Sequence, residues 1–141
     1  MNAVLKAQLT LAFAVGLMRV ESYSARAQVI PPPHFVQQDG ETIFKTVCQG
    51  CHMPDAKGAV GAGRYPALAG NNKLKVAVYP VIVVINGQKA MPAFGASFDD
   101  VQVANIVNYV RTHFGNNYTD KVTAESVKVT RSAVAREDTP H

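Results

Sequence analysis

The stretch Cys48-Gln49-Gly50-Cys51-His52 constrains this chain more than any other, because two cysteines three positions apart are followed directly by a histidine. C-x-x-C-H is the attachment pattern of covalently bound haem. The thiols of Cys48 and Cys51 can add to the two vinyl groups of the porphyrin, and the imidazole of His52 then lies under the ring as a ligand for the iron. The stretch therefore predicts a covalent haem site.

Two other uses of paired cysteines fit the sequence less well. The chain has no further cysteine, whereas an all-cysteine zinc site needs four thiolates. A redox-active C-x-x-C of the thioredoxin kind is expected in a βαβ setting, and the residues around Cys48 show no strand pattern. A disulfide or a non-haem metal site is therefore the alternative to haem attachment.

The length and charge of the chain exclude other classes of protein. At 141 residues there is room for one domain at most. The chain carries 14 lysines and arginines against 10 aspartates and glutamates, a formal net charge of +4. This excess is far below that of a nucleic-acid-binding surface, so we expect no nucleic-acid partner.

The first 27 residues have the pattern of a secretory signal peptide. Lys6 supplies the positive start, Leu9 to Met18 form an apolar run, and Ala25-Arg26-Ala27 offers a cleavage site. A membrane-spanning helix needs roughly 20 apolar residues, so an uncleaved anchor is the weaker alternative. We predict a cleaved signal peptide over residues 1–27, and membrane contact only if the signal stays uncleaved.

Residues 28–38 follow as a proline-rich arm. Three consecutive prolines, Pro31 to Pro33, cannot continue a helix and favour an extended backbone. His34 lies in this arm, and we expect a solvated linker residue there and not an iron ligand.

The first helix is predicted to deliver the C-x-x-C-H stretch. Asp39 is suited to cap its N-terminus, and the helix runs into Cys48. We expect it to loosen at Gly50, where the lack of a Cβ lets the backbone pass close to a porphyrin. Its apolar stripe, which suits packing against another helix, consists of Ile43, Phe44 and Val47.

The middle of the chain reads as a loop followed by one apolar segment. Glycines and prolines punctuate residues 53–70, which predicts an irregular loop. Val76 to Ile85 is apolar throughout, so periodicity does not distinguish a buried strand from a short helix. Its β-branched residues favour a strand, whereas Asn86-Gly87 is a good C-terminal stop for a helix that begins near Tyr79.

The last helix of the domain is the clearest in the sequence. Asp99 and Gln102 are spaced as a capping box, and apolar residues recur at helical spacing up to Phe114. Arg111 is expected to interact with the negative C-terminal end of this helix, which stops at Gly115.

Residues 117–141 extend beyond that helix. Thr123 can cap a short helix over residues 124–129, and the end of the chain is polar. His113, just before the extension, is expected at the surface and not as an iron ligand.

Four strings of this sequence resemble class I c-type cytochromes, the small single-haem group. They are the C-x-x-C-H stretch, Tyr-Pro-Ala-Leu-Ala-Gly at 65–70, Met-Pro-Ala-Phe-Gly at 91–95 and Asn-Tyr-Val-Arg-Thr-His-Phe-Gly-Asn at 108–116. The resemblance implies an all-α fold of three to five helices wrapped around one covalently bound haem c, with the domain over residues 39–116. It also implies a helix over 76–85, and a crossing of the first and last helices where Tyr109 packs near Phe44.

The resemblance further implies which residues meet the haem. Met91 is the expected second axial ligand opposite His52, and the backbone carbonyl of Pro66 is expected to accept the other imidazole N–H of His52. Arg64 and Tyr65 are candidates for contacting a haem propionate. The alternatives are a solvated Arg64 and a Met91 that only fills a gap in the core.

An iron with both axial positions filled changes oxidation state without binding a substrate, so the expected function is electron transfer and not catalysis. The resemblance implies a periplasmic location, and the last three strings look like cytochromes that accompany periplasmic flavin-, quinone- or molybdenum-dependent dehydrogenases. The expected partners are a periplasmic dehydrogenase and an oxidase or other cytochrome, with the chain a free shuttle or a dehydrogenase subunit. The alternative is a haem enzyme or gas-binding sensor with labile Met91 ligation.

Overall fold

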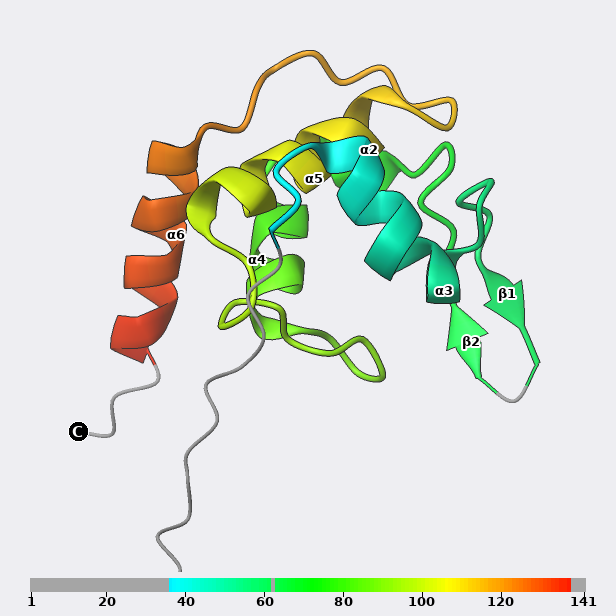
Figure 1. The fold of residues 1–141 in the computed structure, drawn as a ribbon, viewed down its shortest axis with the longest axis horizontal. Coiled ribbons are helices and arrows are strands. Elements are labelled where there is room, and N and C mark those ends of the chain that lie inside the picture. Colours follow the sequence, from blue (N-terminus) through cyan, green and yellow to red (C-terminus); the bar gives the residue numbers. More distant parts are fainter. Residues whose placement is uncertain (1–35, 62, 138–141) are drawn as a thin grey trace, which may run out of the picture. The chain divides into compact units, whose positions relative to one another are not determined.

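The computed structural model describes residues 36–61 and 63–137 of the chain. Most of their regular structure is helical, as Figure 1 shows, so the fold is the small all-α fold that the sequence predicts. The predicted signal peptide, His34 and most of the proline-rich arm lie outside the described residues. Within the described part of the chain, no helix has the length and apolar character needed to cross a membrane.

The first helix has three joined parts: α2 (Gly40–Ile43), the wider π-helical turn η1 (Phe44–Cys48) and α3 (Gln49–His52). Asp39 caps it as predicted, since its carboxylate accepts the backbone N–H of Thr42 at 2.8 Å. The helix thus begins well before the C-x-x-C-H stretch and ends on its histidine.

The sequence predicts that this helix loosens at Gly50, but the structure places the wider turn over η1. The hydroxyl of Thr46 donates to the carbonyl of Thr42, so a side chain satisfies that acceptor. The backbone N–H of Gln49 then reaches back five residues to the carbonyl of Phe44, which is the π-helical pattern.

The first helix crosses α5 (Asp100–Thr112) closely, as Figure 1 shows. A Cβ at Gly40 would lie 2.2 Å from the carbonyl oxygen of Asn105 and 2.7 Å from Cβ of Tyr109, so only glycine fits at the crossing. The rings of Phe44 and Tyr109 lie with centroids 5.8 Å apart. This confirms the predicted aromatic contact between the two helices.

The apolar segment that periodicity left open is a helix, α4 (Val78–Asn86). Pro80 is its third residue, where a missing backbone N–H removes no helical hydrogen bond. At the start of α5 the predicted capping box is present: the carboxylate of Asp99 accepts the N–H of Gln102 at 2.8 Å, and the side-chain oxygen of Gln102 accepts the N–H of Asp99 at 2.9 Å.

The core lies on the inner face of α5, which packs against α2, α4 and α6 (Ala124–Glu137). Its buried apolar residues follow the helical spacing that the sequence shows. They are Val103, Ala104, Ile106, Val107 and Val110.

The predicted loop over residues 53–70 contains a small hairpin. β1 (Ala59–Val60) pairs antiparallel with β2 (Arg64–Tyr65), and a 3₁₀ turn, η2 (Asn72–Lys75), follows. Two-residue strands are too short for an alternating pattern to reveal them in the sequence. Ala56 is fully buried before the hairpin, and its carbonyl accepts two backbone N–H groups from beyond it, which closes the segment into a compact loop.

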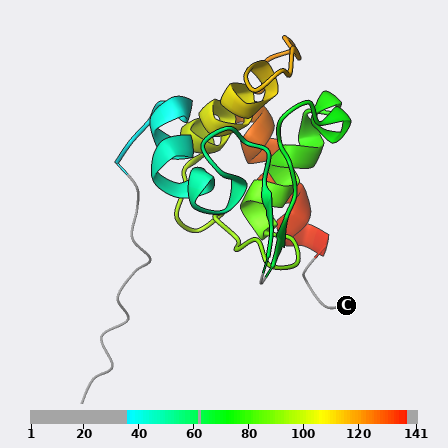
Figure 2. The ribbon, with the colours of Figure 1, turned by 90° about the vertical axis from the view of Figure 1, so that its right-hand side faces the viewer.

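The C-terminal extension folds onto the same core. Thr123 and Ser126 cap α6 reciprocally, so the helix starts where predicted but continues well past residue 129. Val122 is 6% exposed and Val127 is 0% exposed. Both views place α6 beside α4 and α5, against which it packs (Figure 1, Figure 2). Residues 117–137 therefore contribute packing to the domain.

Candidate cofactor site

A cavity of about 580 Å³ lies beside the C-x-x-C-H stretch. The residues that line this cavity belong to the first helix, to β2 and the loop after it, to η2, to α4 and the segment after it, and to α5. Its walls are mainly apolar, formed by Val47, Leu68, Leu74, Pro80, Val83, Val84, Phe94, Ile106, Val107 and Val110. The four residues that the sequence and the resemblance single out for haem and iron also line it: Cys48, Cys51, His52 and Met91.

His52 is held in one orientation at the wall of the cavity. It is the last residue of α3 and is 8% exposed. Its Nδ1 lies 3.0 Å from the carbonyl oxygen of Pro66, the contact that the resemblance implies. Because a carbonyl only accepts, Nδ1 carries the proton of a neutral ring, and Nε2 keeps its lone pair for a metal.

The two thiols lie in different surroundings. Cys48 is half-buried, whereas Cys51 is exposed. Burial, and after it the neighbouring Cys51, raise the pKa of the Cys48 thiol to about 12. The reactive thiol of a redox-active C-x-x-C pair has a lowered pKa, so the raised pKa of Cys48 is not the pattern of such a pair.

Met91 lies on a tight turn that follows α4. The N–H of Gln88 donates to the carbonyl of Met91 at 3.0 Å, and the N–H of Met91 donates to the carbonyl of Gln88 at 2.9 Å. Gly87 precedes this turn with φ 72°, and a Cβ there would lie 2.5 Å from the carbonyl oxygen of Met91. The turn therefore depends on a glycine at position 87.

Polar side chains stand among the residues that line the cavity. Arg64 and Tyr65, singled out in the sequence, come from β2. The hydroxyl of Tyr79 donates to the side-chain oxygen of Gln88 over 3.4 Å. Lys73 and Lys89 also line the cavity, and the sequence offers no motif that marks the remaining polar lining residues, which are Asn71, Tyr79 and Gln88.

These residues fit a covalently bound haem. A haem is a flat apolar ring with two carboxylates at one edge and an iron that takes a ligand on each face. The cavity has apolar walls, two thiols, an imidazole with an available Nε2 and a thioether, and its polar residues include the cations Arg64, Lys73 and Lys89.

His113 lies outside this arrangement, as predicted. It is exposed, its Nδ1 lies 2.9 Å from the carbonyl oxygen of Tyr109, and its ring stacks on that of Tyr109 with centroids 4.2 Å apart. It does not line the cavity.

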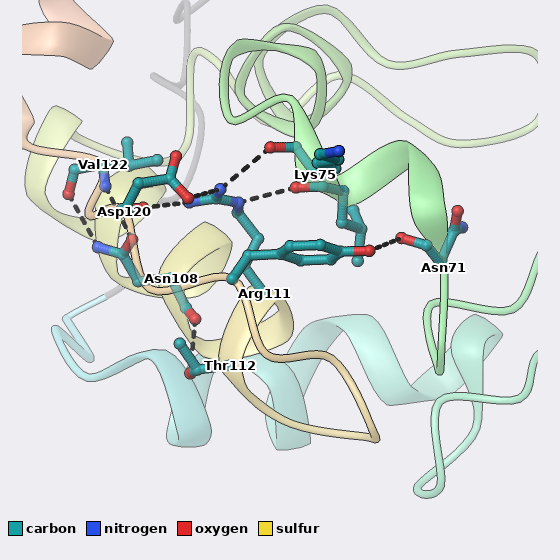
Figure 3. A network of polar contacts seen from close by, with 9 residues as sticks. Asn71, Lys75, Asn108, Arg111, Thr112, Asp120 and Val122 are labelled. Atoms are coloured by element: carbon teal, nitrogen blue, oxygen red, sulfur yellow. Dashed lines mark hydrogen bonds and ion pairs between the residues drawn. The ribbon is translucent and has the colours of Figure 1, made fainter.

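Arg111 is the largest departure from the sequence-based expectation. Its side chain is fully buried and does not cap the end of α5. It donates to the carbonyl of Leu74 at 2.9 Å and to the carboxylate of Asp120 at 2.6 Å, in the network drawn in Figure 3. Leu74 is part of the cavity wall, so Arg111 ties that wall to α5 and to the start of the extension. An arginine near a helix end gives no sequence signal for such a role.

The family model described as cytochrome C oxidase, cbb3-type, subunit III matches residues 36–110. The chain is 35% identical over 109 residues to the fructose dehydrogenase cytochrome subunit of Gluconobacter japonicus, an alignment that covers 67% of this chain and 22% of that protein. It is 30% identical over 102 residues to the gluconate 2-dehydrogenase cytochrome c subunit of Pantoea cypripedii, covering 64% of this chain and 23% of the relative. Cytochrome c6 of Diacronema lutheri is 35% identical over 81 residues, which are 55% of this chain and 95% of that protein. The chain thus spans less than a quarter of the two dehydrogenase subunits and almost all of the cytochrome c6.

Proposed function

This chain belongs to the cytochrome c family that the cbb3-type oxidase subunit III model describes, and from that premise we propose that it carries single electrons between redox proteins through one covalently bound haem c. One observation carries the proposal. Cys48, Cys51, His52 and Met91 line one cavity, although Met91 comes from the far side of α4 in the sequence.

Each of these four residues has a role in the proposal. Cys48 and Cys51 hold the haem by thioether bonds, while His52 and Met91 ligate the iron. The haem supplies a reversible one-electron change at iron. His52 is kept in register by the carbonyl of Pro66 at 3.0 Å, which fixes the tautomer that leaves Nε2 available. The apolar walls keep water from the ring and limit the rearrangement that accompanies a change of charge.

The polar residues of the cavity serve the haem carboxylates in this proposal. Arg64 and Tyr65 are the first candidates, and Lys73 and Lys89 line the same cavity. A cation beside a propionate stabilises the ionised carboxylate. Lys73 and Lys89 are exposed and also offer positive charge that attracts an acidic redox partner, an effect that weakens as ionic strength rises.

The relatives support a place beside a dehydrogenase. Two of them are named as cytochrome subunits of sugar or sugar-acid dehydrogenases. We propose that the chain is exported by residues 1–27, works in the periplasm, and accepts electrons from a dehydrogenase for an oxidase or another cytochrome. It is a carrier in this scheme and not a catalyst, because His52 and Met91 fill both axial positions of the iron and leave none for a substrate.

The extension is a poor choice for a simple deletion test of partner docking. Val122 and Val127 belong to the core, so removal of residues 117–141 would damage the domain itself. Substitutions on the outer face of α6 separate docking from folding, since Val129 is 60% exposed and Lys128 is also exposed. If the extension docks a dehydrogenase, Val129→Asp weakens electron transfer from that enzyme and leaves the free energy of unfolding unchanged within about 0.5 kcal/mol.

A visible spectrum of the haem-loaded protein tests the proposal. We expect sharp α and β bands after reduction, and a weak methionine–iron band near the red end of the spectrum after oxidation. Met91→Ala should abolish the weak band and let the reduced protein bind carbon monoxide. High-spin ferric iron in the unaltered protein, with ready carbon monoxide binding once reduced, would instead support the haem enzyme or gas sensor. Absence of haem from protein made with the attachment machinery would refute both.

A further inference from the structure

Arg131 lies on α6, the last helix of the described residues, and bonds to the segment between Met91 and α5. Its Nε donates to the carboxylate of Asp100 at 2.9 Å. Its two terminal nitrogens donate to the carbonyls of Gly95 at 2.5 Å and Phe98 at 3.1 Å. One guanidinium therefore binds three acceptors between residues 95 and 100.

The segment that Arg131 holds directly follows the cavity wall in the sequence. Phe94 lines the cavity together with Met91, and its ring stacks on that of Phe98 with centroids 5.2 Å apart. On its other side the same segment is bonded to the end of α4: the N–H of Phe94 donates to the carbonyl of Val84 at 2.9 Å. The segment after Met91 is thus held between α4 and the guanidinium of Arg131.

The contact between Gly95 and Arg131 requires a glycine at position 95 and an arginine at position 131. A Cβ at Gly95 would lie 2.8 Å from the carbonyl oxygen of Ile85 and 3.2 Å from a terminal nitrogen of Arg131, so a side chain there has no room. A planar guanidinium presents five N–H donors in a fixed fork, whereas a lysine offers one small ammonium group. A lysine on the same helix could not reach all three acceptors at once.

The helix that carries Arg131 is itself anchored. Val127, one turn earlier, is fully buried, and α6 packs against both α4 and α5. The Arg131 and Asp100 side chains are 31% and 28% exposed, so this pair is largely shielded from water. The hydrogen bonds of Arg131 therefore link α6 to the segment that follows Met91.

We propose that Arg131 is a positioning residue for the methionine ligand: it fixes the segment over residues 94–100 and so keeps Met91 in the cavity. This inference rests on the proposed function, because it takes Met91 as the second iron ligand. The C-terminal extension then has a role within the haem site, in limiting how often the Met91 segment opens.

Imidazole binding to the oxidised holoprotein measures that opening, since imidazole can reach the iron only when Met91 has left it. Arg131→Met should raise the rate of imidazole binding at saturating imidazole about tenfold, which corresponds to about 1.4 kcal/mol. Arg131→Lys, which keeps the charge and loses most of the fork, should give an intermediate rate. Lys128→Met is the matched control, since it removes an exposed cation one turn away on the same helix and should bind imidazole at the wild-type rate.

Urea dependence separates positioning from a general loss of stability. Opening of one segment exposes little surface, so the imidazole rate should rise only weakly with urea, whereas global unfolding responds steeply. A rate increase in Arg131→Met that follows the steep dependence of global unfolding overturns the inference, as does a rate equal to that of Lys128→Met. If the unaltered protein shows no methionine–iron band, the proposed function fails instead. The two failures are therefore distinguishable.

Discussion

The guanidinium of Arg111 donates to the carboxylate of Asp120 at 2.6 Å, although the arginine side chain is fully buried and that of Asp120 is 68% exposed. The same guanidinium also donates to the carbonyl of Leu74 at 2.9 Å and to the carbonyl of Asp120 (Figure 3). Three segments thus meet on one side chain: η2, α5 and the start of the extension. The buried acceptors depend on Arg111, whereas the aspartate keeps contact with water.

This asymmetry predicts unequal effects of two substitutions. Arg111→Met removes the donor of the buried carbonyl of Leu74 and of the half-buried carbonyl of Asp120, each at a cost of about 1–3 kcal/mol, so we expect a loss of about 3 kcal/mol in the free energy of unfolding. Asp120→Asn keeps a side-chain acceptor at a mainly exposed position, and we expect a loss of about 1 kcal/mol or less. Urea unfolding of the holoprotein measures both, with Lys121→Met as a control at an exposed position. Equal losses for the two variants would contradict this account.

Alanine substitution should have different effects at two glycines: Gly87, which precedes the turn of Met91, and Gly61, which lies elsewhere. Gly87→Ala places a Cβ 2.5 Å from the carbonyl oxygen of Met91 on a backbone with φ 72°. We expect it to weaken or remove the methionine–iron band and to lower the free energy of unfolding by about 2 kcal/mol. At Gly61 a Cβ meets nothing within 4 Å. Gly61→Ala should therefore leave the spectrum unchanged and should change the free energy of unfolding by no more than about 0.5 kcal/mol.

The cap at Asp39 predicts a pH dependence of stability. The hydrogen bonds from Thr42, first that of its backbone N–H, lower the pKa of Asp39 below its ordinary value of 3.8. A lowered folded-state pKa stabilises the fold above the unfolded value, and this contribution is lost as the pH falls through the folded value. Asp39→Asn should therefore differ most from the unaltered protein at about pH 6 and least at about pH 3 or below. Urea midpoints of both proteins at the two pH values measure the difference, and a constant difference would exclude the mechanism.

The cavity predicts that the chain folds poorly without haem. A space of about 580 Å³ with apolar walls lies against α5, the helix that organises the core. Without the cofactor those walls would face water, and a small domain has only about 5–15 kcal/mol of stability to lose. The variant Cys48→Ala/Cys51→Ala, made without haem, should unfold without a cooperative transition in circular dichroism. A sharp transition like that of the holoprotein would show that the protein core suffices by itself.

Local sequence patterns predict the helix starts well. The caps at Asp39 and Asp99 each use a side chain to satisfy the N–H group three residues later, so the sequence alone contains both partners. The apolar stripe of α5 is equally local, because helical spacing decides which face is buried. The segment over α4 is ambiguous in the sequence, since a run that is apolar throughout fits a strand or a helix; the structure shows a helix that packs against α5 and α6.

The C-x-x-C-H stretch and the resemblance to class I cytochromes together indicated the four haem and iron candidates and the Pro66 carbonyl. The four candidates are residues whose chemistry is unusual: thiols, an imidazole and a thioether. The polar side chains of the cavity lining, such as Asn71 and Tyr79, were not anticipated. Polar residues in a loop have no periodicity that says which way they face.

The sequence by itself therefore determined the helix caps, the apolar faces and the reactive groups, because each of these depends on neighbours along the chain. Only the tertiary structure decided the roles of Arg111 and Arg131. Most of their acceptors are backbone carbonyls of distant segments, at Leu74, Gly95 and Phe98. Every residue has a carbonyl, so no pattern of residue types marks the one that a buried guanidinium will reach. That contact exists only after α4, α5 and α6 have packed together.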